Sequence, residues 1–350
     1  MQASTVALAG YASYIPSMLP NPIVENDSQP LAHADWPTFG WSDDVRPALA
    51  QAMAEGRPAA LATLYKVEGS APRGPGAQML FVGNAATGYF SGDCIEGDVA
   101  SHAREVLETG RPQRLHYGMG SPWIDIRLRC GGALHVLVER VLPDSPAMQA
   151  LLANARGRQV CIWHSDGVRQ DVTAGDAPLM VLHDEPFALA RRHDPPRRLI
   201  VTGGDPGALA LARLGADAQF ETVLVRPHGP QTPPPFFVSR YLRAPIGDAL
   251  EELGLDRWTA YVGATHEDEH DLSGCLAALR GGAGYVAMIG AKSRASDRLA
   301  ALQAAGATEA ELAQLHLSPG IKGLGKAPWE VATGILAQVM QALNPSHERA

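Results

Sequence analysis

The 350-residue chain is poor in cysteine and contains no long apolar run. Its four cysteines, at positions 94, 130, 161 and 275, are too few and too scattered for a disulfide framework. We therefore expect reduced thiols and a cytoplasmic location. No apolar stretch approaches the roughly 18 residues that a membrane-spanning helix needs. No lysine or arginine precedes Arg46, so the basic start of a secretory signal is not expected.

Positive charge and metal-binding motifs are also scarce. Lysine and arginine total 29 against 37 aspartates and glutamates, and the net charge of -8 argues against general nucleic-acid binding. No Cys-x-x-Cys pair occurs among the four cysteines, and we expect no structural zinc. The apolar fraction of 46% supports a full core, and the length favours two domains.

The pattern of predicted elements changes along the chain. Residues 1–41 show no sustained period and are expected to form an irregular arm. Residues 42–192 combine strand-like runs with a helix from Ile95 to about Thr109, which predicts a mixed α+β domain. A charged, proline-bearing linker at 193–198 leads to residues 199–350, where strands alternate with helices. The predicted fold class is α/β, with a Rossmann-like, doubly wound parallel sheet in the second domain.

Two short cysteine motifs stand out in the first domain: Ser91-Gly92-Asp93-Cys94-Ile95-Glu96 and Cys130-Gly131-Gly132. Each places a thiol at a sharp corner beside glycine, where a ligand can approach the main chain. Asp93 and Glu96 are predicted to form a capping box at the start of the helix. The alternating run over 123–130, followed by two glycines, predicts a strand and a hairpin turn. For both thiols, a ligand contact and a small buried core residue remain open alternatives.

A loop rich in glycine and proline, Glu68-Gly69-Ser70-Ala71-Pro72-Arg73-Gly74-Pro75-Gly76, follows the strand predicted over 60–65. Arg73 has the fork of donors that suits a phosphate or pyrophosphate group, with a solvated loop arginine as the alternative. The loop also carries the Ser70 hydroxyl. Glu68 either accepts hydrogen bonds from amino groups of a ligand or fixes the loop.

The glycine corner after the linker departs from the dinucleotide-binding fingerprint. Counting Gly203 as the first glycine, the second place holds Asp205 and the third holds Ala208, while Gly204 stands between. A carboxylate about 4 Å from a phosphate costs roughly 4 kcal/mol at an effective dielectric of about 20. The acidic residue expected after the second strand is replaced by Arg226. NAD(P) binding is therefore doubtful, and a scaffold with a lost or changed ligand is the alternative.

His266 follows the carboxyl end of a predicted strand, which is the usual ligand side of a doubly wound sheet. Acidic residues surround it. A ligand contact and a solvated loop histidine are both open interpretations.

Taken in order, these motifs resemble those of the XdhC/CoxI family, the xanthine dehydrogenase accessory proteins. The resemblance covers about residues 45–343. It is carried by Glu68 to Arg73, Cys94 with Glu96, Cys130-Gly131-Gly132, Thr265-His266, Gly284-Tyr285-Val286 before Ile289-Gly290, and the stretch from Ser318 to Ala332.

The resemblance implies a chaperone-like maturation factor rather than a turnover enzyme. Its members are implied to bind and protect the molybdenum cofactor (molybdopterin). With a cysteine desulfurase they support replacement of an oxo ligand by sulfur, and they deliver the cofactor to the apoenzyme of a molybdenum hydroxylase. No nucleic-acid or membrane partner is expected, and a homodimer stays open. The candidate thiols are Cys94 and Cys130, and the candidate cofactor-binding residues are Glu68, Ser70, Arg73, Glu96, Gly131, Gly132, Gly203, Gly204 and His266.

Three departures from the family pattern concern the ligand rather than the fold. Asp93 replaces the second glycine of a Ser-Gly-Gly-Cys turn, Gly203-Gly204-Asp205-Pro206 replaces Gly-Ala-Gly-His, and Pro319-Gly320-Ile321 replaces Pro-Ile-Gly. Two other functions compete with the maturation factor. One is an NAD(P)-dependent oxidoreductase using the Rossmann domain, although no Tyr-x-x-x-Lys pair is present; the other is a protein–protein adaptor.

Overall fold

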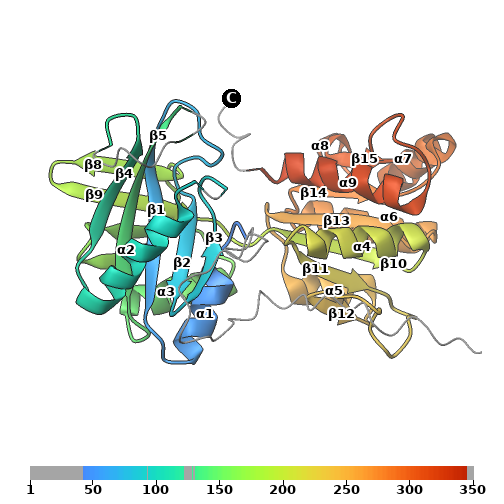
Figure 1. Cartoon of the computed structure of the whole chain (residues 1–350). Coiled ribbons are helices and arrows are strands. Elements are labelled where there is room, and N and C mark those ends of the chain that lie inside the picture. Colours follow the sequence, from blue (N-terminus) through green and yellow to red (C-terminus); the bar gives the residue numbers. More distant parts are fainter. Residues whose placement is uncertain (1–41, 93, 122–127, 129–130, 345–350) are drawn as a thin grey trace, which may run out of the picture. The chain divides into compact units, whose positions relative to one another are not determined.

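A computed structural model describes residues 42–344 except 93, 122–127, 129 and 130, and these form two compact units (Figure 1). The N-terminal unit ends at Pro195 and the C-terminal unit begins its main segment at Pro196. The predicted arm over 1–41, Asp93, and the predicted strand over 123–130 with Cys130 lie outside the described residues. The loop between the units covers only 194–197, because the flanking strands include His193 and Arg198, both buried.

The first sheet of the N-terminal unit is antiparallel, in the order β3-β2-β1-β5-β4. Because neighbouring strands alternate in direction, β1, β3 and β4 end where β2 and β5 begin. The loops over 69–77 and 89–95, and the chain that follows Gly118, therefore leave the sheet at one end, which we call the loop end. The strands are β1 (Ala59–Glu68), β2 (Gln78–Val82), β3 (Ala85–Gly88), β4 (Gln113–Gly118) and β5 (Ala133–Val141).

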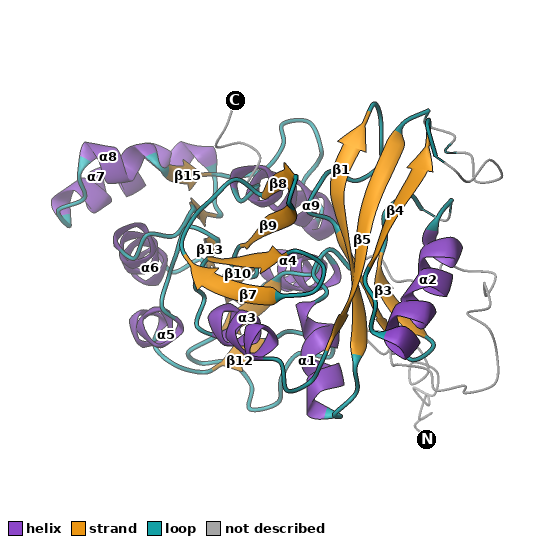
Figure 2. Ribbon diagram, turned by 90° about the vertical axis from the view of Figure 1, so that its left-hand side faces the viewer, coloured by secondary structure: helices purple, strands orange, loops and turns teal. Residues whose placement is uncertain are grey.

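Helix α2 (Glu96–Thr109) lies along one face of this sheet, as Figure 2 shows for β1, β5 and β4. Its buried residues Val99, Ala103 and Val106 have the helical spacing that the sequence predicted, and they pack on strand residues such as Ala62 and Val136. Gly110 ends the helix with a left-handed φ of 70°.

The opposite face of the first sheet packs on α1 (Arg46–Ala54), α3 (Pro146–Arg156) and a second antiparallel sheet, ordered β7-β6-β9-β8. Cys161 and Trp163 are fully buried in this core. Glu139 is buried there too and accepts hydrogen bonds from Ser165, Trp163 and Gln170, while burial raises the pKa of its carboxyl. The second sheet comprises β6 (Cys161–Ser165), β7 (Gln170–Ala174), β8 (Met180–Asp184) and β9 (Phe187–His193).

The C-terminal unit contains a six-stranded parallel sheet in the order β12-β11-β10-β13-β14-β15. Numbered within the unit, this is the 3-2-1-4-5-6 order of a Rossmann fold, so the predicted fold class is confirmed. The ligand crevice of such a sheet lies at the carboxyl ends of β10 and β13, where the strand order reverses. The strands are β10 (Arg198–Gly203), β11 (Glu221–Val225), β12 (Arg240–Leu242), β13 (Thr259–Ala264), β14 (Tyr285–Met288) and β15 (Leu315–Leu317).

Helices cover both faces of the parallel sheet. Two helices, α4 (Pro206–Asp217) and α9 (Pro328–Ala342), pack on one face, and α5 (Ile246–Leu253) with α6 (Asp268–Arg280) packs on the other. Cys275 of α6 is fully buried, in keeping with its predicted structural role. A short 3-10 helix (Lys292–Arg294), α7 (Ala295–Ala304) and α8 (Glu309–Ala313) lie between β14 and β15 in sequence. Within the described residues, no helix combines the length and apolarity needed to cross a membrane.

The junction of β10 and β13 gives a first testable prediction. Gly203 has a φ of 126°, and a methyl group there would lie 2.6 Å from the carbonyl carbon of Ala264 and closer still to its oxygen. Gly203→Ala is therefore expected to lower the free energy of unfolding by about 3 kcal/mol. Urea denaturation followed by circular dichroism measures this change.

Gly247 of α5 is the matched control, because nothing lies within 4 Å of a methyl group placed there. Gly247→Ala should raise stability by about 0.5–1 kcal/mol, the usual gain for alanine in a helix. Equal stability of the two variants would contradict the close packing at Gly203.

Candidate functional site

Two of the predicted motifs are in direct main-chain contact at the loop end. A methyl group at Gly132 would lie 2.8 Å from the carbonyl oxygen of Glu68 and closer still to that of Ser70. A methyl group at Gly69 would meet the Cα of Gly132 at 3.4 Å. Only glycine allows this approach at Gly132, which explains the residue type. Gly131 is exposed with a φ of 72°, nothing lies within 4 Å of a methyl group placed there, and its N–H donates to the Leu128 carbonyl oxygen at 3.1 Å.

The corner that carries Cys94 is shaped by the buried carboxylate of Glu96. One oxygen of Glu96 accepts the N–H groups of Phe90, Ser91 and Gly92 at 2.9, 2.6 and 3.0 Å, and the other accepts the Ser91 hydroxyl at 2.6 Å. Ser91 Oγ in turn accepts the Cys94 N–H at 2.9 Å. Burial opposes ionisation of Glu96, but these hydrogen bonds lower the pKa of its carboxyl below the usual value.

This geometry differs from the predicted capping box. Helix α2 begins at Glu96, with Ile95 at the N-cap position and no side-chain cap. Glu96 instead turns back onto the preceding loop, where its carboxylate accepts three main-chain N–H groups. Both of its oxygens are thus engaged in the corner that precedes α2 and carries Cys94.

Among the cysteines that the structure describes, Cys94 is exposed whereas Cys161 and Cys275 are buried. Burial raises the pKa of the thiols of Cys161 and Cys275 above the usual value, which makes them unreactive. Cys94 is therefore the accessible thiol of the described part of the chain. The companion thiol predicted at 130 lies outside that part.

Arg73 connects the 69–77 loop to the 89–95 loop. Its guanidinium carbon lies 4.6 Å from the centroid of the Tyr89 ring, and the group forms an ion pair with Asp43. Its side chain is 20% exposed. Burial acts to lower the pKa of Arg73, but the hydrogen bond with Tyr89 and the charge of Asp43 raise it overall, so the group stays cationic.

Glu68 lies at the carboxyl end of β1 and is about half exposed. Lys66 Nζ approaches its carboxylate at 2.6 Å and His135 Nε2 at 3.3 Å, and the hydrogen bond from Lys66 lowers the pKa of Glu68. The ring of His135 stacks on His116 at 4.2 Å. Burial, followed by the proximity of His116, lowers the pKa of His135.

Sequence reasoning missed the two histidines, although a signal existed. His116 and His135 are cross-strand partners in the β4–β5 pair, so the alternation of these two strands places both side chains on one face. This signal can be used only when the register of the two strands is known, and the sequence alone does not give that register.

A buried arginine supports the 69–77 loop from the second sheet. Arg191 Nε donates to the carbonyl oxygen of Gly76 at 2.7 Å, and its Nη1 lies 2.6 Å from His193 Nδ1. Burial, together with the nearby charge of Arg46, lowers the pKa of Arg191 to about 10. This contact joins residues 115 positions apart and has no local sequence signal.

The crevice of the C-terminal unit is occupied by its own side chains. Asp205 caps α4, with its Oδ1 accepting the Ala208 N–H at 2.8 Å, and its Oδ2 lies 3.1 Å from His266 Nε2. The guanidinium of Arg226 lies so close to Gly204 that a methyl group there would overlap it. A carboxylate thus takes the N-terminal position of the helix where a dinucleotide pyrophosphate binds. The geometry does not fit ordinary NAD(P) binding.

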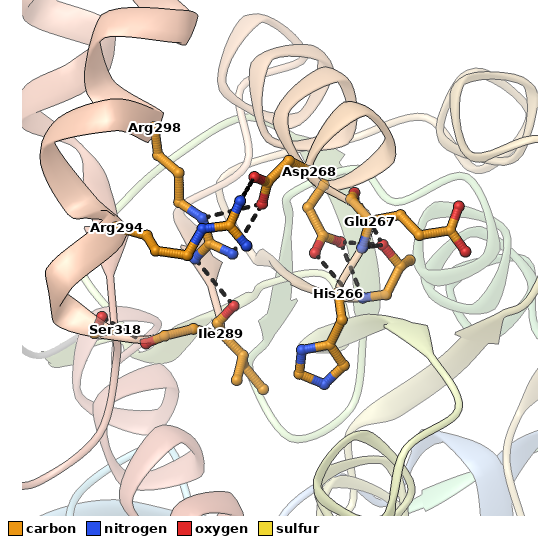
Figure 3. A network of polar contacts seen from close by, with 10 residues as sticks. His266, Glu267, Asp268, Ile289, Arg294, Arg298 and Ser318 are labelled. Atoms are coloured by element: carbon orange, nitrogen blue, oxygen red, sulfur yellow. Dashed lines mark hydrogen bonds and ion pairs between the residues drawn. The ribbon is translucent and has the colours of Figure 1, made fainter.

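His266 is held in place by the buried carboxylate of Asp271. This carboxylate accepts the Thr265 N–H at 3.0 Å and the His266 N–H at 3.2 Å, which stabilises the left-handed φ of 63° at His266. Figure 3 shows the neighbouring network, in which Arg294 and Arg298 both point at Asp268. Arg298 also donates to the Ile289 carbonyl oxygen at 3.2 Å. These two arginines thus hold the start of α6, at Asp268, next to the end of β14.

The structure therefore brings the predicted site residues together in two groups, one in each unit. Glu68, Ser70, Gly131 and Gly132 lie together at the loop end, where Tyr89 connects Arg73 to the corner of Cys94 and Glu96. Gly203, Gly204 and His266 lie at the crevice of the C-terminal unit. Within the described ranges, no three histidine, cysteine, aspartate or glutamate side chains gather as a metal site.

The chain matches known families in both units. Residues 52–118 match the XdhC and CoxI family, and residues 199–339 match the XdhC Rossmann domain. The chain belongs to the XdhC/CoxI family, as its ordered motifs predicted.

The similarity to two relatives and to one solved structure extends over most of the chain. It is 25% identical over 302 residues to a protein of Escherichia coli strain K12 named molybdenum cofactor insertion chaperone PaoD, covering 85% of this chain and 88% of that protein. It is 24% identical over 313 residues to a protein of Bacillus subtilis strain 168 named as a probable xanthine dehydrogenase subunit, covering 81% and 92%. The crystal structure of a xanthine dehydrogenase from Bacillus halodurans has the same fold, with a TM-score of 0.68, 21% identity, and coverage of 87% and 96%.

The engagement of Glu96 gives a second prediction. Glu96→Gln should lower the free energy of unfolding by about 2–3 kcal/mol, because an amide N–H₂ cannot accept the hydrogen bonds that a carboxylate oxygen accepts. Since the pKa of Glu96 is lowered on folding, the wild-type advantage is complete above the usual value of 4.5 and is lost as the pH falls through the lower folded value. Denaturation from pH 7 to pH 3 measures this dependence.

Glu105→Gln on the exposed side of α2 is the control and should change stability little. A pH-independent difference between wild type and Glu96→Gln would show that the Glu96 carboxylate does not hold the Cys94 corner.

Proposed function

We propose that this chain is a maturation chaperone that binds the molybdenum cofactor as cargo and inserts it into a molybdoenzyme. Family membership supports this, as does likeness over most of the chain to a relative named as a molybdenum cofactor insertion chaperone. The observation that carries the proposal is the main-chain contact of Gly132 with Glu68 and Ser70, together with the packing of Arg73 on Tyr89 of the loop that bears the exposed thiol of Cys94. None of these features requires the chain to catalyse a reaction with multiple turnovers.

The residues at the loop end fit the chemistry of such a cargo. In this proposal Arg73 pairs with the phosphate of the pterin, the Ser70 hydroxyl donates a hydrogen bond to it, and the exposed Gly131 leaves space for the ligand beside its main chain. Gly132 allows the two loops to meet, and Glu68 accepts hydrogen bonds from pterin amino groups. Cys94, held by Glu96 through Ser91, is the thiol that faces the molybdenum or the sulfur delivered to it, with Cys130 as its predicted companion.

The C-terminal unit has a smaller part in this proposal. Gly203 allows the close approach of Ala264, Gly204 gives room to Arg226, and we assign neither glycine a cargo contact. His266 is the remaining candidate, because its side chain is about half exposed and Asp205 fixes the orientation of its ring.

The finer steps follow from the same assignment. The cofactor supplies the molybdenum centre on which an oxo ligand is replaced by sulfur. The sulfur would come from a cysteine desulfurase, and the recipient would be the apoenzyme of a xanthine dehydrogenase-type hydroxylase. The chain itself holds the cargo, orients it against Cys94 and shields it from water.

The alternative function, from a different class of protein, is that of an NAD(P)-dependent oxidoreductase. The carboxylate of Asp205 disfavours it, because a phosphate at the start of α4 would have to displace this capping group and overcome its negative charge.

Replacement of the exposed thiol gives the test of this function. Cys94→Ser should weaken retention of molybdenum cofactor by about tenfold, or ~1.4 kcal/mol, because a serine hydroxyl stays protonated near neutral pH and cannot replace a thiolate contact. Cys275→Ser is the control and should leave retention unchanged, since Cys275 is buried in α6. Molybdenum content and native mass spectrometry after incubation with the cofactor provide the measurement.

Equal retention by the two variants would remove the special role of Cys94. In the same spectra of the wild-type chain, a retained pterin supports the chaperone. A retained nicotinamide nucleotide would indicate the oxidoreductase instead, and retention of neither would indicate an adaptor.

A further inference from the structure

Two consecutive aspartates before α1 have different environments. Asp44 receives two hydrogen bonds from Arg46, both at 2.8 Å, and accepts the Arg46 N–H at 3.0 Å. The Arg46 side chain is only 9% exposed, so this pair is anchored in the core beside α1. The segment that carries both aspartates is thereby fixed next to the 69–77 loop.

Asp43 reaches from this segment to Arg73, and the two members of the pair are unequally buried. The Asp43 side chain is 59% exposed, whereas the Arg73 side chain is 20% exposed. Tyr89 covers the guanidinium from the other loop, with 4.6 Å between the guanidinium carbon and the ring centroid. The arginine is thus held by the fold, while the carboxylate approaches it from solvent.

This asymmetry has an energetic consequence. A largely desolvated guanidinium needs an anionic partner, because its lost hydration is otherwise uncompensated. An exposed carboxylate recovers its hydration when it leaves, so exposed pairs of this kind contribute little net stability. A phosphate group carries more charge and presents several oxygens to the donor fork of arginine. Replacement of the Asp43 carboxylate by a phosphate group, as the partner of Arg73, should therefore lower the free energy.

We propose that Arg73 is a phosphate-binding residue whose resident counter-ion, Asp43, is displaced when the ligand enters. The ligand is a phosphate monoester or diphosphate group, and Tyr89 acts as the platform that keeps the guanidinium in place during the exchange. This deepens the proposed function, on which the identity of the phosphate as part of the molybdenum cofactor rests. The exchange also couples ligand entry to the segment before α1.

Calorimetric titration of the full chain with inorganic pyrophosphate at low ionic strength tests the exchange. Asp43→Asn should bind pyrophosphate about two- to fivefold more tightly than wild type, because the competing carboxylate is gone. The gain should shrink as salt is added, since both charges are partly exposed. Arg73→Lys should bind about tenfold more weakly, because lysine retains the charge but lacks the fork.

Two further variants make the result specific. Glu252→Gln removes one negative charge from the exposed Arg240–Glu252 pair of the C-terminal unit and should leave pyrophosphate affinity unchanged. In an Arg73→Gln background, where no cation is left at position 73 for Asp43 to pair with, the gain from Asp43→Asn should disappear. An equal gain from Asp43→Asn and Glu252→Gln, or a gain that persists without Arg73, would overturn the proposal, as would unchanged pyrophosphate binding in Asp43→Asn.

Repeating the titrations with molybdenum cofactor released from a molybdoenzyme separates the two claims. A gain in Asp43→Asn for pyrophosphate without any binding of the cofactor would support the exchange and contradict the proposed function. Binding of the cofactor with the same affinity by wild type, Asp43→Asn and Arg73→Lys would support the function and overturn the exchange.

Discussion

The candidate site depends on how closely two main-chain segments approach at the loop end of the first sheet. Gly132 lies against the carbonyl groups of Glu68 and Ser70 with no space for a side chain. The pairing of β1 with β5 brings the segments to this point, with Glu68 opposite Ala133 in register. The absence of a Cβ then lets the loops that follow remain in contact. The positions of Ser70, Arg73 and the Gly131 main chain all follow from this contact.

Both units use carboxylates to organise the turn between a strand and the next helix. Glu96 binds three main-chain N–H groups before α2, Asp205 caps α4, and Asp271 holds the turn before α6. In a Rossmann fold such N–H groups commonly bind phosphate. Here the protein's own carboxylates occupy them, which is why the proposed recognition of an anionic ligand is assigned to a side chain, that of Arg73. Asp205, which replaces the second glycine of the dinucleotide-binding fingerprint, is one of these carboxylates. Its presence at the start of α4 is a reason to look for the anion site in the N-terminal unit instead.

Much of the fold was predictable because its signals are local. The strand runs and amphipathic helices of the C-terminal unit predicted the parallel sheet, and the period of Val99, Ala103 and Val106 predicted α2. The prediction of a capping box with Glu96 was wrong, because the Glu96 carboxylate instead accepts the main-chain N–H groups of the preceding loop. The short helix α5 and the edge strands β12 and β15 were missed, since short elements carry too few residues to show a period.

The sequence by itself determined the family, the class of the fold and the residue types of the site. Glycine, arginine and cysteine at ordered positions reflect local backbone and chemical requirements that can be read one motif at a time. Only the tertiary structure decided which motifs meet: Tyr89 under Arg73, Asp43 as its counter-ion, and Arg191 supporting Gly76 from 115 residues away. Contacts of this kind depend on strand direction, register and packing, which have no signature in any single stretch of sequence.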